Sequence, residues 1–305
     1  NSLEFFVFSP FIITTYFLIQ IRYRIPLLLI ASYVFYGWWN INYLFIIIFS
    51  TSIDYFLGIR LHVSKNKKIK KLYLYLSLIA NLGILFFFKY LTFFSTILSS
   101  ILGSFNFEYD IPTHNFLLPI GISFYTFQTL SYTIDIYRRK IIPETNFFKF
   151  ALYVSFFPQL LAGPIERAKS LIPQFHFNYS FEYNRVVGGL RIVLWGLFKK
   201  IVIADRIATY TNPIFENPEK IFGLDIWFAS ILFCFQIFCD FSSYSDIAIG
   251  IARVIGINLS KNFGNRPYIA KSYVDHWSMT HITLSKWLRD YFFIPFFSRS
   301  KIFSV

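Results

Sequence analysis

The sequence predicts an all-α, polytopic membrane protein, a helical bundle in one domain covering residues 1–305. Of the 305 residues, 55% are apolar and 22% aromatic, and 15% are charged, whereas soluble domains usually carry about 25% charged residues. The mean hydropathy is +0.51. The apolar residues form nearly uncharged runs such as FFVFSPFIITTYFLIQI (5–21) and LYLYLSLIANLGILFFF (72–88). Such runs approach the roughly 20 residues that a membrane-spanning helix needs.

Each predicted helix is an apolar run that ends at charged or turn-forming residues. The first run ends at Arg22, and two short runs separate it from a lysine-rich turn that begins at Lys65. Beyond Lys140 the runs are interrupted by prolines, so we expect some of these helices to be short or re-entrant. The predicted helices are 5–21, 26–38, 42–59, 72–88, 90–102, 116–137, 147–162, 186–204, 224–239 and 243–257.

The basic residues lie between the apolar runs, which is typical of cytoplasmic turns under the positive-inside rule. They cluster at 22–24, 60–71 and 138–140, and the segment 103–115 carries Glu108 and Asp110 without any Lys or Arg. This pattern predicts a multi-pass protein, in contact with membrane lipid, whose N-terminus lies outside. The net charge of +13 therefore indicates topology and not a nucleic-acid-binding surface, which would gather basic residues on one face.

Several polar side chains occur within apolar runs, where lipid would not tolerate them. Gln128 and Gln159 are two of them, and Gln159 belongs to the Pro- and Gly-containing segment FFPQLLAGPIERA (156–168). We expect that segment to be buried in protein or to line a wet cavity, because lipid cannot pair its free backbone groups. Gln128 and Gln159 are candidate channel-lining residues. For Gln128, as for Gln236, a hydrogen bond between helices is the simpler interpretation.

Asp240 and Asp246 are carboxylates at membrane depth, where each needs a partner or a wet cavity. On one unbroken helix they would point about 120° apart, so a paired-carboxylate active site is not expected. The run DFSSYSD (240–246) has the composition of a helix break with a cap, and Asp240 is a further channel-lining candidate. Cys234 and Cys239 lack the spacing of a metal site, and we expect neither a metal nor a bound cofactor.

The segment THITLSKWLRDY (280–291) is polar within an apolar chain. If residues 277–292 form one helix, Trp277, His281, Leu284 and Leu288 lie on one stripe. His281 would face the interior, where an imidazole suits proton transfer at neutral pH, although a lone buried histidine is more often a hydrogen-bonded core residue. Ser285 and Arg289 would lie one and two turns further along the same helix.

Several motifs together resemble the membrane-bound O-acyltransferase family, in particular the bacterial branch that modifies alginate and teichoic acids. They occur in the family's order along most of the chain. The matching stretches are NSLEFFVFSP, LPIGISFYTFQTLSYTIDIYR, SFFPQLLAGPIERAKSLIPQF, GLFKKIVIADRIATY, FQIFCDFSSYSDIAIGIARVIGINLSKNF, PYIAKSYVDHW and HITLSKWLRDYFFIPF.

The resemblance implies helices around a funnel or channel in a bacterial inner membrane. It also implies an activated acyl donor on the cytoplasmic side, acetyl-CoA or another acyl thioester. The acceptor would be a hydroxyl of an extracellular polysaccharide, reached directly or through a periplasmic acyltransferase partner. The family's first signature histidine corresponds to His281. A second, more directly catalytic histidine lies in a downstream Gly-Leu-Trp-His-Gly motif that no residue here matches, so we expect an inactive N-terminal fragment.

The motif around His281 departs from the family pattern. Relatives usually have Phe-Trp-Arg-Arg-Trp-His where this chain has HWSMTH (276–281), which leaves recognition of the donor or partner by this segment open. Two other functions are compatible with the composition: a transporter or flippase, since Pro-broken helices also line substrate paths, and a non-catalytic scaffold for polysaccharide export. The chain lacks a matching pair of broken segments in its two halves, which argues against an inverted repeat.

Overall fold

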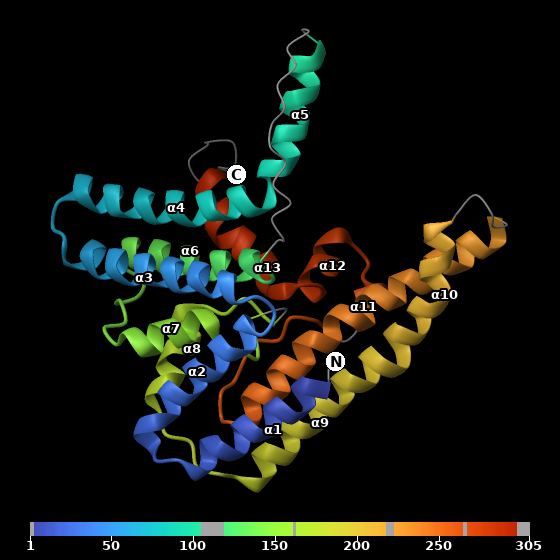
Figure 1. Cartoon of the computed structure of the whole chain (residues 1–305), viewed down its shortest axis with the longest axis horizontal. Helices are drawn as coiled ribbons and strands as arrows, with labels where there is room; N and C mark the ends of the chain where they lie inside the picture. The colour runs from blue at the N-terminus through green and yellow to red at the C-terminus, as the bar shows by residue number, and fades with distance from the viewer. Residues whose placement is uncertain (1–2, 105–118, 161–162, 218–222, 265–266, 298–305) are drawn as a thin grey trace. The chain divides into compact units, whose positions relative to one another are not determined.

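The computed structural model describes residues 3–104, 119–160, 163–217, 223–264 and 267–297 (Figure 1). Throughout these ranges the regular structure is helical, as predicted. They form two compact units, which we describe separately. The first unit comprises Asn1–Leu28, Phe156–Glu166 and Pro173–Val305, and the second comprises Leu29–Ser155 and Arg167–Ile172. Most of the predicted outer loop at 103–115 lies outside the described residues.

The second unit is a small helical bundle. Helices α3, α4 and α6 pack against one another, and α7 packs against α3 and α6. The helices of this unit, including α2, which begins in the first unit, are α2 (Arg24–Gly37), α3 (Ile41–Val63), α4 (Lys67–Lys89), α5 (Leu91–Ser104), α6 (Ile122–Tyr137), α7 (Phe147–Ser155) and α8 (Ala168–Leu171).

Helix α3 has one face that suits a protein interior and one that suits lipid. Ile47 and Leu61 are fully buried. Phe45, Phe49 and Phe56 lie on another face and are 60 to 70% exposed. Lipid solvates such a face, whereas water does not. By length and composition, α3, α4 and α11 of the other unit could each cross a membrane, and α1 and α5 are shorter apolar helices.

The centre of the second unit is polar, a feature the sequence prediction missed. Asp54 of α3 accepts hydrogen bonds from the Ser77 hydroxyl (2.6 Å) and from the Asn81 amide (2.8 Å to Oδ2). The Asn81 side-chain oxygen in turn accepts from the hydroxyls of Ser50 (2.9 Å) and Thr129 (3.1 Å). All five side chains are buried. Side-chain hydrogen bonds therefore connect α3, α4 and α6 in the interior of this unit.

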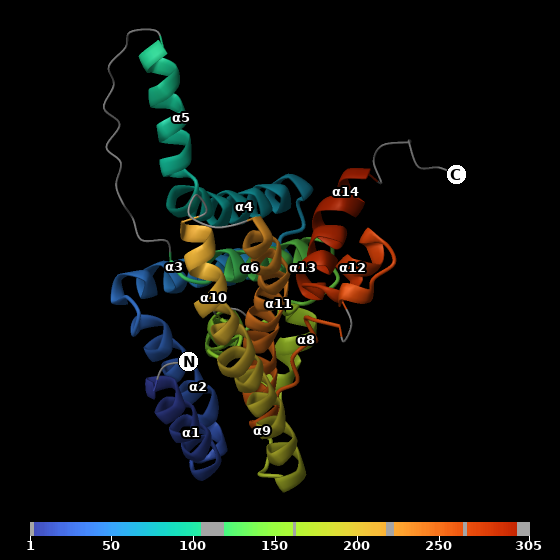
Figure 2. The same cartoon turned by 90° about the vertical axis from the view of Figure 1, so that its right-hand side faces the viewer.

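The first unit is organised around the long helix α11, beside which α9 and α10 run in both views (Figures 1 and 2). A π-helical segment, Phe198–Ala204, joins α9 to α10. A second π-helical segment, Leu288–Phe293, lies between α13 and α14. The helices of this unit are α1 (Leu3–Leu18), α9 (Tyr183–Leu197), α10 (Asp205–Glu216), α11 (Gly223–Val254), α12 (Tyr273–Met279), α13 (Ile282–Trp287) and α14 (Ile294–Phe297).

Glycine lets α9 and α11 approach closely. A Cβ atom added at Gly250 would lie 2.7 Å from the Gly189 carbonyl oxygen and 2.8 Å from the Val193 nitrogen. Both atoms are backbone, so a helix would have to move. Small residues at such crossings are typical of helix pairs in membranes.

We expect Gly250→Ala to lower the free energy of unfolding by roughly 1–3 kcal/mol, because overpacking forces backbone shifts. Unfolding in detergent, followed by circular dichroism, measures the change. Gly83→Ala on α4 is the matched control, since a Cβ there meets nothing within 4 Å and alanine favours helix. Equal losses for the two variants would contradict the close packing of α9 and α11.

Five of the predicted helices differ from the structure. Helices 224–239 and 243–257 are one continuous helix, α11, so the predicted break at 240–246 is wrong. The predicted helix 147–162 ends at Ser155, ahead of the Pro158 turn. The predicted helix 186–204 becomes π-helical at Phe198 and is followed directly by α10. No helix was predicted at the position of α10. The predicted 116–137 begins at Ile122 in the described residues.

Candidate functional site

His281 lies at a break between two short helices, not within the single helix 277–292 that the sequence predicted. Helix α12 ends at Met279, Thr280 is extended, and α13 begins at Ile282. The loop at 262–264 supplies the hydrogen bonds that a continuous helix would have made internally. Gly264 N–H donates to the Met279 carbonyl (2.7 Å), and Ile282 N–H donates to the Asn262 carbonyl (2.9 Å).

The backbone of His281 is left-handed, with φ 46° and ψ 48°. This conformation is uncommon for a residue with a Cβ atom because of steric crowding. Residues held in such conformations cluster at functional sites. The strained backbone therefore identifies His281 as a candidate functional residue, independently of the chemistry of its side chain.

Asn262 is the hydrogen-bonding centre around His281. Its side chain is buried, and its Oδ1 accepts from the Thr283 N–H (3.2 Å) and the Thr283 hydroxyl (2.8 Å). The His281 Nδ1 lies 3.3 Å from the same oxygen. The Asn262 amide nitrogen donates to the Ser245 hydroxyl of α11 (3.3 Å). The buried amide therefore connects the histidine to the long helix.

These contacts fix the tautomer of His281. A backbone N–H can only donate, so the Asn262 atom facing the Thr283 N–H is the oxygen, although amide orientations are otherwise ambiguous. The histidine nitrogen facing that oxygen must then carry the proton. In the neutral imidazole this leaves the lone pair on Nε2.

His281 is half-buried, and its ring meets the edge of Phe241 with centroids 4.8 Å apart. It lies outside α3, α4 and α11, the helices of membrane-spanning length within the described residues. Burial lowers the pKa of His281 from 6.5 to about 4, because the cationic imidazolium loses solvation. At neutral pH the imidazole is uncharged, and Nε2 can accept a hydrogen bond.

The lowered pKa predicts a loss of stability in acid. Between pH 6.5 and about 4 the unfolded chain binds a proton at His281 and the folded protein does not. The free energy of unfolding therefore falls as the pH drops through this range, and the full contribution is present above pH 6.5. Thermal unfolding in detergent from pH 4 to 8 should give a shallower dependence for His281→Gln than for the wild type. Parallel curves would contradict the assignment.

The Pro- and Gly-containing segment supports the same site. Ile165 N–H donates to the Thr283 hydroxyl (3.1 Å), and Glu166 accepts from the Ser260 hydroxyl (3.2 Å) and backbone N–H. Phe156 and Gln159 of this segment are buried, which confirms burial of its described part. Residues 161 and 162 lie outside the described residues.

The predicted site residues have different partners in the structure. Ser285 is one turn further on, and its N–H donates to the His281 carbonyl (3.0 Å). Arg289 is exposed and pairs with Asp290 (2.9 Å), so its side chain is engaged away from His281. Gln128 belongs to the second unit, where its amide donates to the Tyr153 carbonyl of α7 (2.5 Å). That is the hydrogen bond between helices that the sequence favoured.

Asp240 and Asp246 take part in ion pairs and do not cap a helix break. Lys200 pairs with Asp240 and with Asp205 (2.8 Å), and Lys199 pairs with Asp246 (2.8 Å). Both lysines lie in the π-helical segment after α9. The two aspartates were recognised from the sequence as carboxylates that need a partner. Their lysine partners were not predicted, because residues 198–204 have the composition of an ordinary apolar helix. The capping prediction is wrong because α11 continues through residues 240–246.

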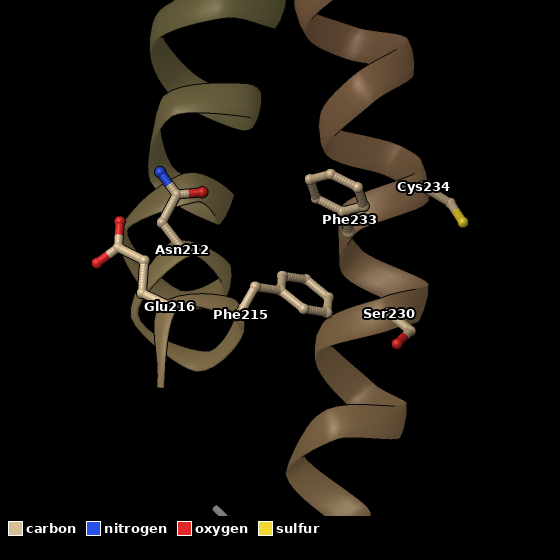
Figure 3. A pocket seen from close by; sticks show the side chains of 6 residues that line it. All are labelled: Asn212, Phe215, Glu216, Ser230, Phe233 and Cys234. Carbon is tan, nitrogen blue, oxygen red and sulfur yellow. The ribbon is translucent and has the colours of Figure 1, made fainter. Parts of the chain in front are cut away.

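A cavity of about 520 Å³ lies between α10 and α11. Phe215 and Phe233 point toward each other across it, whereas the Cys234 sulfur points away (Figure 3). Asn212, Glu216 and Ser230 complete its lining. None of these six side chains is a predicted site residue, and the cavity does not include His281.

The fold and the His281 site define a class of protein: a polytopic helical membrane protein with a strained, uncharged histidine held by a buried amide. Residues 73–305 match the profile of the membrane-bound O-acyltransferase family. The chain belongs to this family.

Three similar proteins are named for the acylation of alginate, peptidoglycan or teichoic acid. The chain is 39% identical to a probable alginate O-acetylase of Pseudomonas aeruginosa, over 96% of this chain and 56% of the relative. It is 38% identical to a peptidoglycan O-acetyltransferase of Helicobacter pylori (97% and 61%) and 28% identical to a teichoic acid D-alanyltransferase of Bacillus subtilis (61% and 47%). The chain thus spans 56 to 61% of the length of the first two relatives.

Proposed function

We propose that the complete protein is an O-acetyltransferase of a bacterial inner membrane. It takes an acetyl group from an acyl thioester such as acetyl-CoA on the cytoplasmic side and transfers it to hydroxyls of an extracellular polysaccharide, directly or through a periplasmic acyltransferase partner. Membership of the family and the names of the relatives support the reaction class. The choice of acetyl follows the names of the alginate O-acetylase and the peptidoglycan O-acetyltransferase given above. The charge pattern of the sequence supports an N-terminus outside.

The observation that carries the proposal is the hydrogen bond between His281 Nδ1 and Asn262 Oδ1, which leaves Nε2 as an acceptor. An imidazole with a pKa of about 4 is a weak base, but it accepts a hydrogen bond without becoming charged. His281 therefore orients the acceptor hydroxyl through Nε2. The hydroxyl oxygen forms a bond to the acyl carbon as the carbon–sulfur bond breaks, and its proton passes to a stronger base of the complete protein. The leaving thiolate takes up a proton.

Ser285 supplies a second polar group near His281. Its hydroxyl is buried and has no hydrogen-bond partner among the described residues. A buried hydroxyl usually has a partner, and a substrate oxygen would provide one. Donors aimed at the oxygen of the acyl group stabilise the charge that develops there during transfer. We assign this role to Ser285.

Labelled acetate distinguishes acyl transfer from transport. Cells lacking their own enzyme of this class are supplied with the complete gene and with isotopically labelled acetate, and the extracellular polysaccharide is isolated. An O-acetyltransferase leaves label that mild alkali releases from the polymer, because esters are base-labile. A transporter or a scaffold does not acetylate the polymer, so it adds no base-labile label. Folded protein in the membrane without base-labile label on the polymer would overturn the proposal.

A further inference from the structure

A cavity of about 480 Å³ in the second unit is lined by basic residues from separate elements. It lies where α3 ends, α4 begins and α6 ends, and the turn from α3 to α4 can be followed in Figure 1. We call it the basic pocket and define it by His62, Lys65, Lys70 and Arg139 with the apolar side chains Ile136 and Ile141. Its lining contains neither Asp nor Glu among the described residues.

The cations of the basic pocket lack an acidic partner among the residues that the structure describes. Lys65, Lys70 and Arg139 form no ion pair with any residue in the described part of the chain. By contrast, Lys199 and Lys200 in the other unit both face carboxylates. Converging like charges raise the local potential and attract anions. The pocket is therefore built to receive a negative group.

The start of α4 adds to this potential. Four lysines occupy its first five residues, KKIKK (67–71), and its first turn contains no acidic residue. The N-terminal end of a helix carries partial positive charge, so lysines there are unfavourable and an anion is favourable. The α4 terminus and the basic pocket share Lys70. Both features therefore favour the binding of an anion at this place.

Arg139 has a strained, left-handed backbone, and its side chain lines the basic pocket. Arg139 has φ 59° and follows α6 at the position that glycine usually occupies after a helix. The Lys140 N–H donates to the Asp135 carbonyl (2.8 Å), which closes this helix end. Glycine would fit without steric cost. Arginine at this position places a guanidinium on the pocket.

The pocket also has an apolar side and lies beside candidate membrane spans. Ile136 is buried, Ile141 is half-buried, and both line the cavity together with Val63. Helices α3 and α4, whose ends form the pocket, are each long enough to cross a membrane. Phospholipid phosphates lie at the ends of such helices, and basic clusters there recognise anionic lipids.

We propose that the basic pocket binds the phosphate group of an anionic phospholipid. Lys65, Lys70 and Arg139 hold the phosphate, and Ile136 and Ile141 contact the adjoining apolar part of the lipid. A soluble phosphate would satisfy the cations but not the apolar side. This inference is independent of the proposed acyl transfer.

Lipid binding is tested on the purified complete protein in neutral detergent by thermal unfolding. Short-chain phosphatidylglycerol should raise the Tm in a saturable way, and short-chain phosphatidylcholine and inorganic phosphate should not. Changing Lys65, Lys70 and Arg139 together to glutamine should weaken phosphatidylglycerol binding about tenfold or more. Changing the exposed Lys169, Lys261 and Lys271 to glutamine removes the same charge from residues outside the pocket and the α4 terminus and should leave the binding within about twofold of the wild type.

A single variant guards against misfolding of the triple one. Arg139→Gly relieves the left-handed backbone, so it should fold at least as stably as the wild type while binding phosphatidylglycerol several-fold more weakly. Equal loss in the two triple variants, or equal binding of phosphatidylcholine, would overturn the pocket assignment. Saturable stabilisation by inorganic phosphate at the same concentrations would overturn the lipid in favour of a soluble phosphate.

Discussion

Replacing His281 by alanine in the complete protein is expected to lower the rate of the proposed polysaccharide acetylation by about 100-fold or more, because a hydroxyl without its orienting acceptor is misplaced from the acyl carbon. The expected loss lies in the rate and not in the amount of folded protein. The rate is measured as base-labile label appearing on the polymer per unit of protein in the membrane.

His276 provides the matched control for His281. It is five residues away, and its Nδ1 contacts the Pro267 carbonyl at 3.1 Å. His276→Gln keeps a polar side chain at a position outside the Asn262 cluster. Its rate should stay within a few-fold of the wild type. Similar losses at both positions would show that the segment, and not the imidazole of His281, is what the reaction needs.

Asn262 separates a positioning role from a merely structural one. Asn262→Asp keeps the acceptor oxygen but places a negative charge 3.3 Å from His281 Nδ1, which raises the pKa of the imidazole. A protonated Nε2 cannot accept a hydrogen bond. The variant should therefore be slow at neutral pH and recover as the pH rises through the raised pKa of His281. Asn262→Leu should be slow at every pH, and an unshifted profile for Asn262→Asp would contradict the role.

The sequence predicted His281 but not the geometry that makes it unusual. The family motif marked the residue, whereas the helical stripe drawn through Trp277 and Leu284 assumed continuous helical hydrogen bonds. The loop at 262–264 competes for those bonds and breaks the helix at Thr280. Asn262 stood in the quoted motif INLSKNF without being singled out. An asparagine in an apolar chain, close to a Gly, was the available signal.

The apolar parts of α3 and α4 were predictable, but both helices extend into the charged residues that were predicted to form a turn, because α3 ends at Val63 and α4 begins at Lys67. The predictions also failed where polar residues mark contacts with other helices rather than a helix end. Asp240 and Asp246 suggested a break in α11 because their lysines lie 40 or more residues away in sequence, in a π-helical segment. Side-chain pairing across elements overrode local composition there. Periodicity within one segment cannot reveal such a pairing.

The polar centre of the second unit did have a sequence signal. Ser50 and Asp54 of α3, Ser77 and Asn81 of α4, and Thr129 and Thr133 of α6 are pairs spaced by four residues, so each pair lies on one helix face. Three polar faces among apolar helices must meet one another, because lipid cannot satisfy them. The structure brings them together around Asp54.

Asp54→Leu is expected to destabilise the protein by about 1–3 kcal/mol in total, because it removes the carboxylate that accepts from the Ser77 hydroxyl and the Asn81 amide. Each donor keeps one weaker contact, the Ser77 hydroxyl with the Thr133 hydroxyl (3.1 Å) and the Asn81 amide with the Ser77 carbonyl (3.0 Å). Asp54→Asn keeps one acceptor oxygen and should cost less. Its new amide would face the Asn81 amide across the present 2.8 Å contact, so one of the two must turn. Unfolding midpoints in detergent measure both changes.

A double variant tests whether the cost comes from unsatisfied groups. Asn81→Leu alone leaves the Asp54 carboxylate buried without its amide donor, and no described cation pairs with that carboxylate. Removing Asp54 and Asn81 together leaves fewer orphaned groups than the two single changes add up to. The double loss should therefore be smaller than the sum of the single losses, with a coupling of about 0.5–3 kcal/mol. Additive losses would mean that α3 and α4 are held by apolar packing alone and that the buried carboxylate contributes little to their pairing.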